Sequence, residues 1–156
     1  MFFVAAPGVV AGLVPWMLTG WRVREHAPYP AFVRVFGAVL LAAGLVALIQ
    51  AFWRFVVEGL GTPAPVAAPA RLVIGGPYRY VRNPMYVAVL AVIIGQTLLL
   101  GQPILLAYAA VLWLIVASFV RFYEEPTLSR RFGAEYEAYR RAVPAWRPRL
   151  RPWRPG

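Results

Sequence analysis

The sequence contains no cysteine, no lysine and only one histidine, His26. The lack of cysteine excludes disulfides and thiolate metal sites, and one histidine does not make a histidine-based metal centre. Charge is also scarce: 14% of the 156 residues are charged, whereas about a quarter is usual in a soluble domain. Apolar residues make up 61% of the chain, and its mean hydropathy is +0.63. This composition predicts an integral membrane protein.

The formal net charge is +10, and every basic residue is an arginine. Strong basicity is typical of proteins that bind nucleic acid or an anionic membrane surface. Because the arginines cluster beside apolar segments and no nucleic-acid motif is present, membrane lipids are the expected partner and nucleic acid is not. The loop after the second apolar segment and the tail after the fourth are rich in arginine, which predicts that both lie on the cytoplasmic side.

Four apolar segments approach the roughly 20 residues that a membrane-spanning helix needs. A glycine and a proline, Gly101 and Pro103, separate the last two segments and predict a tight antiparallel hairpin. The expected fold is therefore all-α and polytopic, with about four transmembrane helices. The four segments are approximately 2–18, 32–53, 85–100 and 104–120.

An amphipathic pattern follows the fourth segment, over about 126–143. Apolar and aromatic residues recur there at helical spacing, which predicts one C-terminal helix lying in the membrane interface. The tail 144–156 alternates proline, arginine and tryptophan and is expected to be extended along the interface, with Trp146 and Trp153 as anchors.

The chain is expected to divide into an N-terminal two-helix transmembrane region, 1–58, and a cofactor-binding region, 59–156. The second region comprises the hairpin 84–120 and a cytoplasmic segment, 121–156. A proline-stiffened connector is expected near 59–70. Residues 72–74 fit either a short strand or an interfacial segment.

Two polar motifs flank the predicted hairpin. Residues 75–86 read Gly-Gly-Pro-Tyr-Arg-Tyr-Val-Arg-Asn-Pro-Met-Tyr, and residues 123–126 read Tyr-Glu-Glu-Pro. Because a hairpin returns the chain to the side it left, Tyr86 and Glu124 are expected at one membrane face. Such a gathering favours an enzyme over a passive membrane protein. The glycines at 75 and 76 do not form a known phosphate-binding loop.

The adjacent carboxylates of Glu124 and Glu125 repel each other at the edge of an apolar span and need partners. Pro126 is expected to interrupt the helix here, so that one carboxylate faces the N-terminus of the next helix. The simpler interpretation is that both glutamates cap this helix and pair with Arg121 or Arg82. Similarly, Asn83 and Pro84 suit a helix start. The nearby tyrosines suit either a wall for a cation or interfacial anchoring, and they are Tyr78, Tyr80 and Tyr86.

Together with segments 132–139 and 143–148, these motifs resemble the membrane methyltransferases that include isoprenylcysteine carboxyl methyltransferase and the phospholipid (phosphatidylethanolamine) N-methyltransferases. The resemblance covers about 59–148 and implies S-adenosylmethionine held without a Rossmann domain. Asn83 stands where the prenylcysteine enzymes typically have histidine, so the motif is closer to the phospholipid enzymes. By resemblance, the catalytic residues are Arg82, Glu124 and Glu125. The implied cofactor-binding residues are Tyr78, Arg82, Asn83, Tyr86, Glu124, Glu125, Tyr136 and Tyr139.

The expected function is S-adenosylmethionine-dependent methyl transfer to a lipophilic acceptor in the inner (cytoplasmic) membrane, with the active site facing the cytoplasm. Replacing Glu124 by glutamine or Arg82 by alanine is expected to abolish cofactor binding and leave the protein folded. The alternatives are an NADPH-dependent reductase of the sterol-reductase type and a non-enzymatic small membrane protein. The sequence leaves open whether the acceptor is a phospholipid amine, an isoprenyl-type thioether acid, a small thiol or a quinone-like lipid, and how many copies of the chain assemble.

Overall fold

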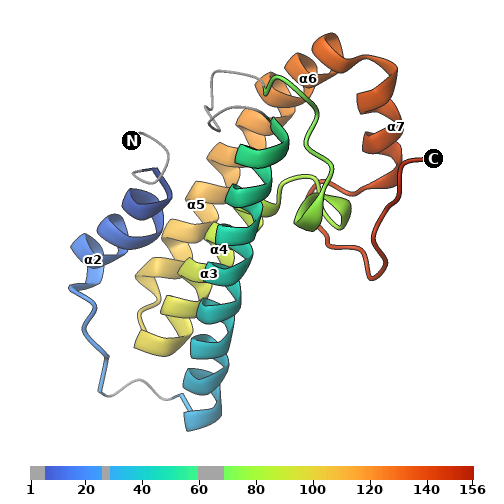
Figure 1. Ribbon diagram of the computed structural model, residues 1–156. Coiled ribbons are helices and arrows are strands. Elements are labelled where there is room, and N and C mark those ends of the chain that lie inside the picture. Colours follow the sequence, from blue (N-terminus) through green and yellow to red (C-terminus); the bar gives the residue numbers. More distant parts are fainter. Residues whose placement is uncertain (1–5, 26–28, 60–68) are drawn as a thin grey trace. The chain divides into compact units, whose positions relative to one another are not determined.

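The computed structural model describes residues 6–25, 29–59 and 69–156, and within these ranges every regular element is helical (Figure 1). The all-α prediction is therefore confirmed. His26 and most of the expected connector at 59–70 lie outside the described residues. In chain order the elements are η1 Val9–Leu13, α2 Val14–Thr19, α3 Ala31–Gly59, η2 Gly76–Arg79, α4 Pro84–Leu100, α5 Ile104–Phe119, η3 Val120–Glu124, α6 Glu125–Phe132 and α7 Ala134–Ala142.

Among the described residues, two helices are long and apolar enough to cross a membrane, Ala31–Glu58 and Ile104–Phe132. In the most apolar 18-residue stretch of each helix, only 11% and 17%, respectively, is buried within the protein. Large side chains such as Phe32 and Ile49 are 72% and 68% exposed. So much exposed apolar surface needs a lipid environment. The other two expected spans correspond to shorter apolar helices, Ala6–Thr19 and Pro84–Leu100.

Residue contacts divide the chain into two compact units. The first comprises Met1–Val46 and Tyr86–Ile115, and the second comprises Ala47–Met85 and Val116–Gly156. The expected division into a transmembrane region, 1–58, and a cofactor-binding region, 59–156, stays a prediction.

Within the first unit, glycines bring α3 and α4 into backbone contact. A methyl group at Gly37 would lie 2.7 Å from the Leu99 backbone nitrogen, and one at Gly95 would lie 2.6 Å from that of Leu41. Both distances are shorter than any carbon–nitrogen contact allows, so no larger residue fits without moving a helix. Small residues at such crossings are a usual basis of helix packing in membranes.

A proline explains the polar contacts that hold the N-terminal helix in the first unit. Pro15 has no N–H to donate. In an α-helix this N–H would bond to the carbonyl of Ala11, and in the π-helical geometry of η1 it would bond to that of Val10, so both carbonyls lack a backbone donor. Two side chains replace these donors. The Gln96 amide donates to Ala11 O at 2.7 Å, and the Tyr108 hydroxyl donates to Val10 O at 2.8 Å. Freed backbone groups within a membrane must be satisfied in this way.

Replacing Gln96 by leucine should lower the free energy of unfolding by about 1–3 kcal/mol, because it leaves the Ala11 carbonyl buried without a donor. The double variant with Pro15→Ala should recover most of this loss, since alanine restores an N–H for that carbonyl. Denaturant unfolding in detergent, followed by circular dichroism, measures both effects. Equal losses in the single and double variants would contradict this account.

A second π-helical turn, η3, precedes Pro126 in the same way, and the helix that begins at Ile104 continues without interruption to Phe132. The expected break at Pro126 is therefore wrong. The wider turn closes with the Glu125 N–H donating to Val120 O, so the chain passes through the proline while remaining helical. The single helix expected over 126–143 is also wrong, because Gly133, with φ of +51°, separates α6 from α7.

The second unit contains two small apolar clusters. Tyr136, Tyr139 and Val143 form one, against which Leu72 and Ile74 pack. The other consists of the buried residues Ala51, Val73 and Tyr78. Residues 72–74 form no strand, but their side chains alternate between the two clusters: Val73 belongs to one, and Leu72 and Ile74 pack against the other.

Candidate active site

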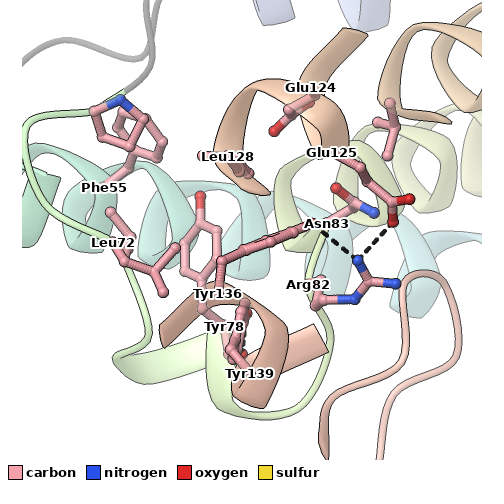
Figure 2. A pocket seen from close by; sticks show the side chains of 13 residues that line it. Phe55, Leu72, Tyr78, Arg82, Asn83, Glu124, Glu125, Leu128, Tyr136 and Tyr139 are labelled. Atoms are coloured by element: carbon pink, nitrogen blue, oxygen red, sulfur yellow. Dashed lines mark hydrogen bonds and ion pairs between the residues drawn. The ribbon is translucent and has the colours of Figure 1, made fainter. Parts of the chain in front are cut away.

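The second unit holds a pocket of about 460 Å³, part of which is open to solvent. Figure 2 shows arginine, glutamate and asparagine side chains on one part of its wall and apolar and tyrosine side chains on the rest. The lining residues are Phe55, Pro69, Leu72, Val73, Tyr78, Arg82, Asn83, Val120, Glu124, Glu125, Leu128, Tyr136 and Tyr139. Seven of the eight residues implied by the resemblance therefore meet around one space. The residues that line the pocket do not include Tyr86, which belongs to the first unit.

Arg82 is at the centre of the polar wall. Its Nη1 donates to Glu125 Oε1 at 2.6 Å and to the Tyr136 hydroxyl at 3.1 Å, and its Nε donates to Val143 O at 2.9 Å. The side chains of Arg82 and Glu125 are only 12% and 10% exposed. A charge-assisted bond so short and so little hydrated fixes the guanidinium in one orientation.

Glu125 collects two further arginines. Arg121 and Arg140 lie 3.6 and 3.7 Å from its Oε2. The carboxylate is also in the first turn of α6, where the helix dipole favours a negative charge. The ion pairs with Arg82 and Arg121 that the simpler interpretation required are present, whereas no side-chain hydrogen bond caps α6.

Glu124 has different surroundings although it is the neighbouring residue. It lines the same pocket and is partly exposed. Figure 2 shows its carboxylate directed away from the Arg82–Glu125 pair, toward the part of the pocket between Leu128 and Phe55. The two adjacent carboxylates therefore point in different directions: Glu125 lies in the ion pair with Arg82, and Glu124 points away from that pair.

The C-terminal residues 143–153 support this wall along the segment 79–83. Both the backbone N–H of Arg82 and the Asn83 side-chain amide donate to carbonyls of the tail, at Pro144 and Ala145, over 2.9 and 3.0 Å. In the other direction, Arg149 N–H donates to the Tyr80 carbonyl at 2.9 Å. The sequence predicts an extended tail but gives no sign of this partner.

Trp153 belongs to the same support. Its backbone N–H donates to Arg79 O, its own carbonyl accepts from Arg79 Nε, and its ring lies 5.5 Å from that of Tyr139. The Trp153 side chain is partly buried against the protein, and its expected role as a membrane anchor stays a prediction.

Tyr136 and Tyr139 join α7 to the pocket. Both are buried, and the Tyr139 hydroxyl donates to Tyr78 O at 2.6 Å. Burial raises the pKa of each hydroxyl above its usual value of 10.0. For Tyr136 the nearby Glu125 raises the pKa further, while Arg82 lowers it. Both tyrosines are therefore neutral at physiological pH, and Tyr139 acts as a hydrogen-bond donor.

The raised pKa of Tyr139 predicts a loss of stability in alkali. A folded-state pKa above the unfolded value of 10.0 means that the stabilisation is fully present below pH 10 and is lost as pH rises toward the folded pKa. Thermal unfolding in detergent from about pH 8 to pH 11 measures this decline. Tyr139→Phe should flatten the decline, and at neutral pH it should cost about 1 kcal/mol for the lost hydrogen bond. An unchanged alkaline slope in this variant would refute the assignment.

The apolar part of the wall was not expected from the sequence. Phe55 near the end of α3, Leu72, Val73 and Leu128 line the pocket. Their sequence positions show only that they are apolar, and nothing local separates them from residues that face lipid.

Fold and pocket define a helical membrane protein whose pocket is walled by arginine, glutamate and tyrosine. The family model for phospholipid methyltransferases matches residues 32–135, and the chain belongs to that family. The family is one of membrane methyltransferases, in agreement with the resemblance found in the motifs. Neither the curated proteins nor the solved structures yield a match.

Proposed function

We propose that this protein transfers a methyl group from S-adenosylmethionine to a lipophilic acceptor, with a phospholipid amine as the first candidate. One observation carries the proposal. A chain of the phospholipid methyltransferase family brings Arg82, Asn83, Glu124 and Glu125 to a single pocket from motifs about forty residues apart.

The pocket fits the cofactor chemically. S-adenosylmethionine presents cationic ammonium and sulfonium groups, a carboxylate, a ribose diol and a flat adenine. Glu124 suits the ammonium or the diol, and tyrosine faces suit the sulfonium. Apolar side chains such as Phe55 and Leu72 suit the adenine, since ligand pockets are mostly lined by apolar and aromatic side chains. The bound cofactor would supply an electrophilic methyl group.

The protein's own residues bind the cofactor, orient it and exclude water from the site. Arg82 is held by three acceptors, so it presents a fixed positive charge that suits a carboxylate. Glu125 fixes that arginine, and Glu124 offers the acceptor that faces the pocket. Methyl transfer to an amine depends mainly on alignment in a dry site, so rigid walls are the main requirement.

The proposal includes a location. The arginines of the second unit would hold the pocket at the cytoplasmic face of the membrane, where anionic headgroups attract them. The cofactor would enter from the cytoplasm, and the acceptor would enter from the bilayer.

Calorimetric binding to detergent-purified protein tests the proposal with three ligands. We expect S-adenosylmethionine and S-adenosylhomocysteine to bind and NADPH not to bind. A labelled-methyl assay with phosphatidylethanolamine vesicles then tests the acceptor. Binding of NADPH alone would move the protein to the reductases, and no binding to folded protein would refute the enzymatic role.

A further inference from the structure

Glu58, in the last turn of α3, is hydrogen-bonded to the start of the segment that carries Arg82. Its Oε2 accepts the backbone N–H of Gly75 at 2.7 Å across seventeen residues of sequence. Arg54, one turn earlier on α3, donates to Glu58 Oε1 at 3.2 Å. Glu58 does not line the pocket.

At Gly75 and Gly76, a side chain would meet Glu58 and Arg54, respectively, and would displace them from this arrangement. A Cβ at Gly75 would overlap the Glu58 carboxylate. A Cβ at Gly76 would lie 2.7 Å from Arg54 Cγ, and the φ of +53° at Gly76 disfavours any other residue. This accounts for the glycine pair, which matches no phosphate-binding loop. Glu58 occupies the space that a side chain at position 75 would need, and Arg54 occupies the space needed at position 76.

The Glu58–Gly75 hydrogen bond lies at the beginning of the segment 75–83, which other hydrogen bonds hold in place further along. η2 begins at Gly76, and the carbonyl of Tyr78 within it accepts the Tyr139 hydroxyl at 2.6 Å. Beyond η2, the tail residues 143–153 hold Tyr80 and Arg82 through backbone hydrogen bonds and Asn83 through its side-chain amide. The tail supports the far end of the segment, and Glu58 supports its beginning.

We propose that Glu58 is a positioning residue for the pocket, acting through Gly75 to place η2 and, beyond it, Arg82 and Asn83. It touches neither cofactor nor acceptor. The inference rests on the proposed function for its effect on cofactor binding, but the contact itself can be tested separately.

The first test is amide hydrogen exchange of peptides that cover residues 72–83, in the detergent-solubilised full chain. Wild type and Glu58→Gln should both protect the Gly75 amide, because a glutamine oxygen also accepts its N–H. Glu58→Ala should lose that protection. Glu135→Ala is the matched control, since it removes a carboxylate from an exposed position on α7. Equal exchange in wild type and Glu58→Ala would overturn the proposal.

The second test is the affinity for S-adenosylmethionine. We expect Glu58→Ala to weaken binding about tenfold through misplacement of the pocket wall, Glu58→Gln to restore it, and Glu135→Ala to leave it unchanged. Gly75→Ala should match Glu58→Ala, and the double variant should be no weaker than either. Full binding by Glu58→Ala, or no rescue by glutamine, would overturn the positioning role. If wild type binds no S-adenosylmethionine, the proposed function fails, while the exchange data still decide the Glu58–Gly75 contact.

Discussion

Replacing Arg82 by alanine is expected to abolish S-adenosylmethionine binding and to lower the free energy of unfolding by about 3 kcal/mol. The variant removes the closest partner of a carboxylate that is only 10% exposed. Arg121 and Arg140 remain near Glu125, but at 3.6 and 3.7 Å and with more exposed side chains, so they compensate in part. The sequence-based expectation that this variant stays folded remains a prediction, and the buried ion pair adds that its stability should be reduced.

Two further variants of Arg82 distinguish the effect of its positive charge from the effect of its hydrogen-bonding geometry. Arg82→Lys keeps the charge but not the fork that reaches Val143 O and Tyr136, so it should bind weakly. Arg82→Met combined with Glu125→Gln should be less unstable than the sum of the single variants, because no buried charge is left unpaired. Denaturant unfolding and calorimetry give both quantities. An alanine variant of wild-type stability and affinity would contradict the role of this pair.

Replacing Glu124 by glutamine is expected to weaken S-adenosylmethionine binding about 100-fold, the value of one charge-assisted hydrogen bond to a cationic group. Stability should change by less than about 0.5 kcal/mol, because the residue is partly exposed and glutamine has nearly the same shape. Unfolding and calorimetry on the same preparation distinguish the two effects.

The adjacent position supplies the matched comparison. Glu125→Gln removes the same charge one residue later, where three arginines surround it. This variant should lose stability as well as affinity, since the arginines lose their common partner. If both variants lose stability equally, or if Glu124→Gln binds normally, the division of roles between the two glutamates is wrong.

Much of the fold follows from the sequence because long apolar runs in lipid have few alternatives to helix. The apolar pattern predicts the positions of α3, α4 and α5 correctly. It also predicts the turn at Gly101, where the φ of +67° is one that glycine readily adopts. The expectation at Pro126 failed because local preference does not reveal a π-helical turn, which lets a helix continue through a proline.

The site was predictable to the extent that short motifs carry it. Arg82, Asn83 and the two glutamates could be named because family motifs and charges beside apolar spans are visible in one dimension. Glu58, the tail carbonyls and the apolar wall could not, because a backbone carbonyl has no signature in the sequence and its partners lie far away along the chain.

The sequence by itself determined a helical membrane protein and the polar residues that surround one pocket, because hydrophobic runs and charged motifs act locally. Only the tertiary structure decided how those residues divide their tasks. Glu124 and Glu125 are equivalent in sequence, yet packing gives Glu125 three arginines and directs Glu124 toward the pocket. The physical reason is that burial and distance, which set the strength of each charge, are properties of the folded chain.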